Sequence, residues 1–391
     1  MSSAVGFNNL SSRTDVAIIG GGPAGAATAL ALKRAGRTVV IIERLDSIRP
    51  RVGETLPPDA RLPLESLDLW PEFVNDGHMP SVGNRSAWGS DDLVDRDFIF
   101  SPYGSGWHLD RQRFDQMLQD AAVAAGVILI RRTSLTNFES LPGEGWRLQL
   151  NGPAGSSSVT TRFVVDASGR SAVFAQHHGI KRHLLDRMVG VAGWLEAGSE
   201  GPTRDRFTLV EAVESGWWYS ALMPDGKLVV VYLTDADLAS QRKLRSQDNW
   251  LALLRQTRHT WRRVESHGYR LNGPTEIVAA NSSFLDEVTG DSWLAVGDAA
   301  AAYDPLSSQG ILTALETGLN AAPAINACLN GDQGALQEYA AYSKRISIDY
   351  LSSHLAYYAI ERRWPHSTFW ERRHTRRVQA PSQRAVALSA G

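Results

Sequence analysis

Residues 14–43 read TDVAIIGGGPAGAATALALKRAGRTVVIIE, and this stretch decides the fold. A short apolar run at 14–19 leads into Gly20, and residues 24–35 are rich in alanine and leucine with helical spacing. A second apolar run occupies 39–43. The order strand, glycine turn, helix and strand predicts a βαβ unit with a right-handed crossover, and hence an α/β domain of Rossmann type.

Three glycines in the turn have the spacing G-x-G-x-x-G of a dinucleotide-binding loop. Gly20 permits the tight turn, Gly22 lets the backbone approach a pyrophosphate, and Gly25 allows close packing of helix on strand. Pro23 and Ala24 begin the predicted helix, whose N-terminus favours the phosphate charge. A glycine motif alone is weak evidence, but the strand before it and the helix after it favour a nucleotide site over an ordinary turn.

Glu43, followed by Arg44, ends the second predicted strand, where dinucleotide sites bind a ribose. Its carboxylate accepts hydrogen bonds from a ribose diol and repels a 2'-phosphate. The sequence therefore predicts that the bound dinucleotide is FAD or NAD rather than NADP.

The composition of the 391-residue chain argues against several classes of function. With 40 basic and 42 acidic residues the net charge is -2, which gives no electrostatic reason to expect binding to nucleic acid or to an acidic membrane. The single cysteine, Cys328, excludes an intrachain disulfide and any multi-cysteine metal site. Because we find neither a secretory signal nor a run of about 18 apolar residues, we expect a cytoplasmic protein without a transmembrane segment or a metal.

Hydrophobic periodicity along the chain predicts two intertwined domains and a C-terminal extension. The FAD-binding domain comprises residues 14–75, 111–180 and 285–330. A substrate domain of α+β type comprises 76–110 and 181–284, and is built on a mostly antiparallel sheet with one helix at 248–258. We expect a disordered N-terminus at 1–13, and C-terminal helices followed by a basic tail at 331–391.

A second loop selects FAD through a family resemblance. Residues 297–310 read GDAAAAYDPLSSQG after a short apolar strand. This resembles the flavin loop of FAD-dependent aromatic hydroxylases and flavin-dependent halogenases. The resemblance implies that Asp298 binds the ribityl hydroxyls of FAD and that the flavin ring is faced by the loop and helix start at Pro305, Gln309, Gly310 and Ile311. A helix N-terminus there would stabilise negative charge on a reduced flavin.

Further segments occur in the order of the same family, so the resemblance covers nearly the whole chain. They are GGGPAGAATALALKRAG (20–36), RVGET (51–55), LDRQRFDQML (109–118), VVDASGRSA (164–172) and GWWYSALMPDG (216–226). The resemblance implies that Arg111 contacts the FAD phosphates or the flavin edge, with a solvent-facing arginine as the alternative. It also implies that Gly53 and Glu54 lie in a loop beside the adenosine or the flavin.

Two departures from the family patterns bear on the reaction. Many NADPH-dependent hydroxylases carry Asp-Gly where this chain has Ser168-Gly169, so the electron source stays open among NADH, NADPH and a separate flavin reductase. Flavin-dependent halogenases carry a lysine ahead of a segment resembling residues 87–89, whereas residues 80–88 contain none. Their W-x-W-x-I-P motif is replaced by WWYSALMP at 217–224. Hydroxylation therefore ranks first and halogenation second.

The chain resembles in particular a halogenase-like subgroup of flavoprotein monooxygenases, which includes proteins that modify a tryptophan of a precursor protein to build a tryptophylquinone cofactor. GWWYSALMPDG and ERRWPHSTFW (361–370) carry this resemblance. It implies hydroxylation of an aromatic substrate, of the indole or tryptophan type and free or carried on a peptide or protein, through a flavin C4a-hydroperoxide. Six arginines make this end of the chain basic, namely Arg362, Arg363, Arg372, Arg373, Arg376 and Arg377. We expect this basic end to dock an acidic partner peptide, with a solvated helix face as the alternative.

Such a mechanism needs few titrating side chains, so we predict no catalytic triad. Trp217, Trp218 and Tyr219 lie on a predicted strand of the substrate domain and are candidate walls of the substrate pocket, with core packing as the alternative. His108 is a candidate general base or a buried structural histidine. Two hypotheses stand beside halogenation: a flavoprotein reductase of a C=C bond, and a maturation protein that binds a client while its flavin is structural.

Overall fold

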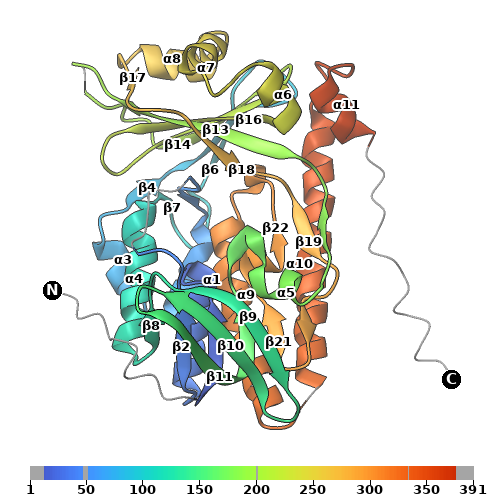
Figure 1. Cartoon of the computed structure of the whole chain (residues 1–391). Coiled ribbons are helices and arrows are strands. Elements are labelled where there is room, and N and C mark those ends of the chain that lie inside the picture. The colour runs from blue at the N-terminus through green and yellow to red at the C-terminus, as the bar shows by residue number, and fades with distance from the viewer. Residues whose placement is uncertain (1–12, 47–51, 200, 333, 376–391) are drawn as a thin grey trace.

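The computed structural model describes residues 13–46, 52–199, 201–332 and 334–375. The disorder expected at 1–13 is wrong for Arg13, which begins the first strand, and residues 1–12 lie outside these ranges. The basic tail after residue 375 lies outside them as well. Figure 1 shows two layers of sheet, one above the other, with a long C-terminal helix along their side.

Most of the lower sheet has the parallel arrangement that the sequence predicts, and its short edge strand at 289–290 is antiparallel to its neighbour. Its central strand, at 13–19, is buried on both faces along most of its length, as parallel strands usually are. In spatial order its strands are β20 (Thr289–Gly290), β21 (Trp293–Ala295), β11 (Gly155–Asp166), β1 (Arg13–Ile19), β2 (Val39–Ile42) and β8 (Ile128–Ile130). Two further strands form an antiparallel extension of β11, namely β9 (Ser134–Leu141) and β10 (Gly145–Gly152).

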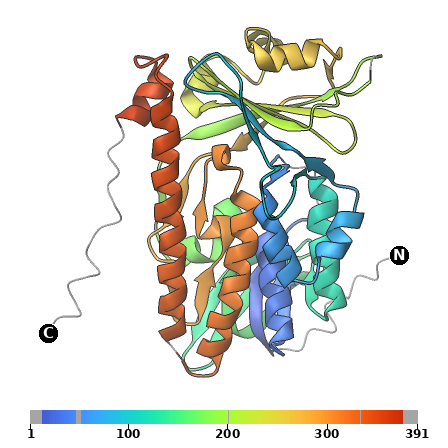
Figure 2. The same cartoon turned by 180° about the vertical axis from the view of Figure 1, so that it is seen from behind.

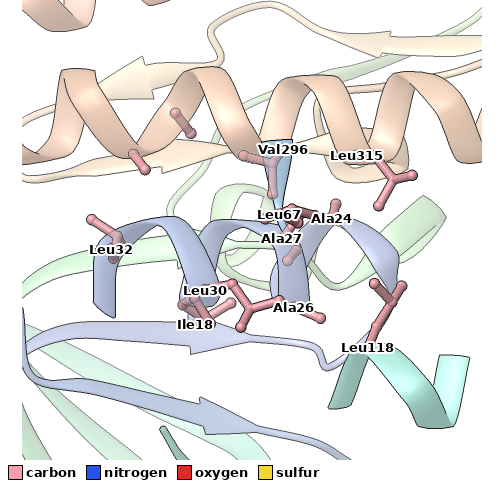
Figure 3. Close-up of a cluster of buried hydrophobic side chains, with 14 of the residues drawn as sticks. Ile18, Ala24, Ala26, Ala27, Leu30, Leu32, Leu67, Leu118, Val296 and Leu315 are labelled. Carbon is pink, nitrogen blue, oxygen red and sulfur yellow. The ribbon is translucent and has the colours of Figure 1, made fainter. Parts of the chain in front are cut away.

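Helices cover one face of this sheet, and the β9–β10 extension with a short helix covers the other. The helices on the first face are α1 (Pro23–Arg34), α4 (Arg111–Ala124) and α9 (Gly310–Leu329), and α5 (Val173–His177) lies on the second. Figure 3 shows Ile18 and Leu30 between α1 and the sheet, and Ala24 on the side toward Leu315 of α9. The two helices approach closely because Gly318 has no side chain: a Cβ there would lie 2.6 Å from the Ala24 carbonyl oxygen.

The upper sheet is antiparallel apart from one parallel pair, formed by the strands at 83–87 and 207–213, which confirms the predicted mostly antiparallel sheet. Its strands are β17 (Arg270–Leu271), β13 (Met188–Glu196), β16 (Leu228–Asp235), β15 (Gly216–Leu222), β14 (Phe207–Val213), β5 (Gly83–Ala87) and β6 (Val94–Asp97), with β18 (Glu276–Ala279) also on β13. Three helices pack on one face instead of the one predicted, namely α6 (Ala236–Gln241), α7 (Gln247–Leu254) and α8 (His259–Glu265). At six and seven residues, α6 and α8 are too short to give a periodic signal.

Two small sheets connect the layers. One contains β3 (Thr55–Leu56), β7 (Gly106–His108) and β4 (Met79–Ser81), and the other contains β12 (Arg182–Leu184), β19 (Ser283–Leu285) and β22 (Ala301–Ala302). Residues 76–110, which were predicted for the substrate domain, are therefore divided between two sheets. Strands β5 and β6 join the upper sheet, whereas β4 and β7 pair in the small sheet with β3. Two short helices, α2 (Arg61–Ser66) and α3 (Trp70–Asn75), precede β4.

Helix α10 (Gly334–Ile360) runs beside both layers and ends near the short α11 (Thr368–His374), as Figure 2 shows from behind. Near its start the Tyr339 hydroxyl donates to the Ala295 carbonyl oxygen at 2.9 Å, and near its end the Trp217 indole donates to the Tyr358 hydroxyl at 3.0 Å. The helix thus fastens the upper sheet to the lower one. Among the helices of the described residues, none combines the length and the hydropathy needed to cross a membrane.

Candidate functional site

A cavity of about 650 Å³ lies where the two layers meet. Its wall includes the glycine loop after β1, the end of β2, the loop before β3, the loop after β21 and the start of α9. The other end of the wall comes from β13, β15, β16 and β18 of the upper sheet. The volume is within the range of small-molecule and cofactor sites.

The glycine loop forms one end of the cavity. Gly20, Gly22, Pro23 and Ala24 line the wall, whereas Gly25 faces the protein interior. Gly20 has a φ of +110°, which favours glycine, and a Cβ on Gly25 would overlap the carbonyl oxygen of Gly20. Gly22 has no atom within 4 Å of its Cβ position, so this side of the backbone is open to a ligand. The three glycines are therefore arranged as the dinucleotide motif requires.

Glu43 and Arg44 line the same end of the cavity. The Glu43 carboxylate accepts hydrogen bonds from the backbone N–H groups of Gly21 and Leu45, both at 2.8 Å. These bonds fix the carboxylate beside the loop and leave it acceptor capacity for a ribose. The sequence did not point to Gln119 of α4, whose amide donates to the Gly21 carbonyl oxygen at 2.7 Å and supports the loop from behind.

The loop after β21 places Asp298 in the cavity wall. The Gly297 N–H donates to the Thr317 hydroxyl at 2.9 Å, and the Arg182 guanidinium donates to the Asp298 carbonyl oxygen at 2.7 Å. Desolvation raises the pKa of the Asp298 carboxyl, against the charges of Arg170, Arg182 and Arg111, which lower it. Arg170, which sequence reasoning missed, also lines the cavity, and its Nε lies 3.5 Å from Asp298 Oδ2.

Two helix N-termini end at the cavity. Gly22 is the N-cap residue of α1, and α9 begins at Gly310, which lines the wall with Pro305 and Ile311. Gln309 is the N-cap residue of α9 but is not part of the wall. Both helices present free N–H groups and the positive end of their dipoles, so the cavity favours an anionic ligand.

Arg111, Gly53 and Glu54 line the middle of the cavity. The Arg111 guanidinium pairs with the Asp115 carboxylate at 3.2 Å and donates to the Gly53 carbonyl oxygen at 3.2 Å. Its side chain is only 10% exposed, so the alternative of a solvent-facing arginine is wrong. Glu54 is fully buried.

Comparison with known proteins agrees with this geometry. A model of the FAD binding domain family matches residues 13–351. The chain belongs to this FAD-binding family. The FAD-dependent oxidoreductase named LodB, from Marinomonas mediterranea, is 31% identical over 364 residues, which is 92% of this chain and 96% of that protein. The flavin-dependent halogenase armH3 of Armillaria mellea is 27% identical over 86% of this chain and 72% of its own length.

Solved structures show the same fold as this FAD-binding protein. The myxobacterial chondrochloren halogenase CndH superposes with a TM-score of 0.86 at 24% identity, over 94% of this chain and 87% of that one. QhpG, described as a peptidyl tryptophan dihydroxylase essential for tryptophylquinone cofactor biogenesis, superposes with a TM-score of 0.68 at 23% identity, over 92% and 78%. The predicted fold class and the assignment as an FAD-dependent oxidoreductase are confirmed.

The cavity fits FAD on its own geometry. The open side of Gly22 and the N-terminus of α1 suit a pyrophosphate, and Glu43 stands at the same end. The N-terminus of α9 favours negative charge on another part of the ligand. The upper sheet lines the far end of the cavity mostly with small and apolar residues, which are Gly190, Val231, Leu233, Val278 and Ala279. Tyr219 and the exposed Glu276 complete this part of the wall.

Of the four candidate pocket residues, only Tyr219 reaches the cavity wall. Trp217 packs in the cluster on the α10 side of the upper sheet, and Trp218 packs on the opposite side with Trp250. Consecutive residues of a strand point to opposite faces, so the three aromatic residues cannot form one wall. His108 is also buried away from the cavity, where its Nε2 lies 3.0 Å from the Thr208 hydroxyl.

Most of the described arginines of the basic end form ion pairs with acidic side chains of the same chain. Arg363 pairs with Glu361 and Asp91, and Arg372 pairs with Asp237. Asp235 pairs with both Arg372 and the buried Arg373. Arg363, Arg372 and Arg373 therefore do not support the expected basic docking surface. Arg362 is exposed and donates to the Ala359 carbonyl oxygen at 3.2 Å, while Arg376 and Arg377 lie outside the described residues.

Proposed function

We propose that this FAD-dependent oxidoreductase is a monooxygenase that hydroxylates an aromatic substrate of the indole or tryptophan type carried on a peptide or protein. The observation that carries the proposal is the continuity of the cavity. It runs from the nucleotide-binding loops to an apolar end beneath the upper sheet. The cofactor-binding end and the substrate-binding end are therefore parts of one cavity.

The residues of the chain divide the binding of FAD among them. The N-terminus of α1 would hold the pyrophosphate, Glu43 a ribose, and Asp298 the ribityl hydroxyls. Arg111 adds positive charge in the middle of the cavity, and the N-terminus of α9 at Gly310 favours negative charge on the ring. When bound and reduced by NADH, NADPH or a separate flavin reductase, FAD supplies the electrons that activate dioxygen.

The apolar end supports an aromatic substrate. Val231, Leu233 and Val278 present aliphatic side chains to the cavity, and Tyr219 adds an aromatic ring with a polar tip. Such a surface favours a flat apolar group and excludes water from the reaction. The name of QhpG, a peptidyl tryptophan dihydroxylase, supports the choice of a peptide-borne tryptophan.

Hydroxylation is preferred to halogenation because the cavity offers no ammonium group. Within the described ranges, no lysine is among the residues that line the cavity. The flavin-dependent halogenases that the sequence resembles use a lysine to convey hypohalous acid. Halogenation stays the second candidate, because armH3 is named a halogenase and the halogenase CndH shares the fold.

The proposal is tested with the FAD-loaded protein, a chemical or enzymatic reductant, dioxygen, and either a tryptophan-containing peptide or free indole. We expect mass spectrometry to show a peptide heavier by oxygen, with the same yield in the presence and absence of chloride or bromide. A halogenated product would replace this proposal with the second candidate. A product formed without dioxygen would indicate a reductase, and stable binding of the peptide without oxygen consumption would indicate a client-binding protein.

A further inference from the structure

Glu54 is a fully buried acid in the cavity wall that the proposed function leaves unused. Its side chain has no exposure to the surrounding solvent, and it lines the middle of the cavity beside Thr55 and Tyr219. One carboxyl oxygen, Oε2, accepts a hydrogen bond from the Tyr219 hydroxyl at 3.3 Å. The other, Oε1, has no hydrogen-bond partner within the residues that the structure describes. A buried polar atom without a partner is unusual and marks a place where a ligand supplies the missing bond.

A chain of hydroxyl groups holds Tyr219 in position. The Tyr219 hydroxyl lies 2.6 Å from the Thr55 hydroxyl, which lies 3.2 Å from the Thr208 hydroxyl. Thr208 in turn lies 3.0 Å from Nε2 of His108. These residues come from β3, β14, β15 and β7, so the chain crosses the junction between the small sheet and the upper sheet. It fixes the tip of Tyr219 against Glu54.

We propose that Glu54 is kept protonated and presents the O–H of its carboxyl to the molecule bound in the cavity, as the proton donor of the site. This inference rests on the proposed function, because it assumes that an oxygen atom gaining negative charge lies at this place. Tyr219 is the positioning residue, and it acts through its hydrogen bond to Oε2.

The surroundings of Glu54 favour the neutral acid. Burial raises the pKa of the Glu54 carboxyl, while nearby backbone N–H groups, the Arg111 charge and the Tyr219 hydroxyl lower it. Arg111 is itself engaged by the Asp115 carboxylate and by backbone carbonyl oxygens, so its charge is partly compensated. Burial also lowers the pKa of His108 to about 3, so the imidazole at the end of the hydroxyl chain is neutral. Arg263 is the cation beside His108 and Tyr219.

The proton balance is simple. The Oε1–H bond of Glu54 breaks, and the proton passes to the anionic oxygen of the bound molecule. The carboxylate that remains is stabilised by the Tyr219 hydroxyl on Oε2 and by the charge of Arg111. It takes up a proton again from water when the product leaves. No electrons are transferred in this step.

The test is carbon-13 NMR of the FAD-loaded protein with labelled glutamate side-chain carboxyls, titrated with pH. We expect a resonance whose midpoint lies above the ordinary glutamate value of about 4.3 and above the pH of the hydroxylation assay, and we expect Glu54→Gln to remove it. Burial also raises the pKa of Glu316, so the resonance of Glu316 should remain in Glu54→Gln. Tyr219→Phe should raise the midpoint further, because the hydroxyl stabilises the charged form. Glu276→Gln is the matched control: Glu276 lines the same cavity but is exposed, and its loss should leave the raised midpoint in place.

The outcomes separate this inference from the proposed function. A Glu54 carboxyl that is ionised at the pH of the hydroxylation assay would overturn the inference, even if the peptide is hydroxylated. The same holds if Tyr219→Phe binds FAD normally but leaves the midpoint unchanged. If the midpoint is raised as expected but no oxygen enters the peptide, the proposed function fails while the assignment of a buried neutral acid stands.

Discussion

The glycine loop allows the fold and the ligand site to be tested separately, by one substitution at Gly25 and one at Gly22. In Gly25→Ala the new methyl group would overlap the Gly20 carbonyl oxygen and would lie 3.2 Å from the Ala167 side chain. The backbone of helix and strand must separate, and overpacking of this kind costs about 1–3 kcal/mol of unfolding free energy. In Gly22→Ala the methyl group meets no atom within 4 Å, and the φ of -76° is normal for alanine.

The two variants should therefore differ in the absence of FAD. We expect thermal unfolding of the apoprotein to show a clearly lower midpoint for Gly25→Ala and an unchanged midpoint for Gly22→Ala. In titrations followed by flavin fluorescence, Gly22→Ala should bind FAD at least about tenfold more weakly, a loss of about 1.4 kcal/mol, because the methyl group occupies the approach to the pyrophosphate. Normal FAD affinity in Gly22→Ala, with a stable apoprotein, would refute the placement of the pyrophosphate at this loop.

Three further predictions concern other parts of the molecule. Burial lowers the pKa of His78 from 6.5 to about 4. The stability that the neutral imidazole contributes is therefore present above pH 6.5 and is lost as the pH falls toward 4. The free energy of unfolding should be about 1.4 kcal/mol lower at pH 5.5 than at neutral pH, and His78→Gln should show a smaller change. Arg373→Met leaves the buried Asp235 with one partner fewer and should destabilise the protein by about 3–5 kcal/mol in denaturant titrations, against under about 1 kcal/mol for the more exposed Arg372→Ala. Trp217→Phe should lower the thermal midpoint while leaving FAD affinity unchanged, and a large loss of affinity would place this residue at the cavity after all.

The nucleotide-binding end of the site could be predicted from the sequence because the residues that form it lie close together in the chain. The glycine loop, its flanking strand and helix, and Glu43 all lie within 14–43, where periodicity and special backbone positions are readable. The loop at 297–310 was assigned through the family resemblance, and a strand and a helix flank it as expected. Most of the candidate cofactor residues in the two segments lie in the cavity wall, and the exceptions are Gly25 and Gln309.

The rest of the site depends on contacts between distant segments. Arg170 and Asp298 are 128 positions apart in the sequence, and no motif near either residue predicts that they pair. The strand that carries the three aromatic residues was predicted, but alternation places Trp218 on the face opposite to Trp217 and Tyr219. Trp217 shares a face with Tyr219 but packs against Trp88 and Tyr358, so Tyr219 alone of the three lines the cavity. His108 lies in a buried network that only the packing of four strands creates.

The central claim is that one cavity joins an FAD site to an aromatic substrate, and the origin of the oxygen in the product tests it most directly. The FAD-loaded protein is reduced without air, mixed with a tryptophan-containing peptide, and exposed to isotopically labelled dioxygen in ordinary water. We predict that the labelled oxygen appears on the indole ring, as read by tandem mass spectrometry. An unlabelled product, a halogenated ring, or an unmodified peptide despite reoxidation of the flavin would contradict the account.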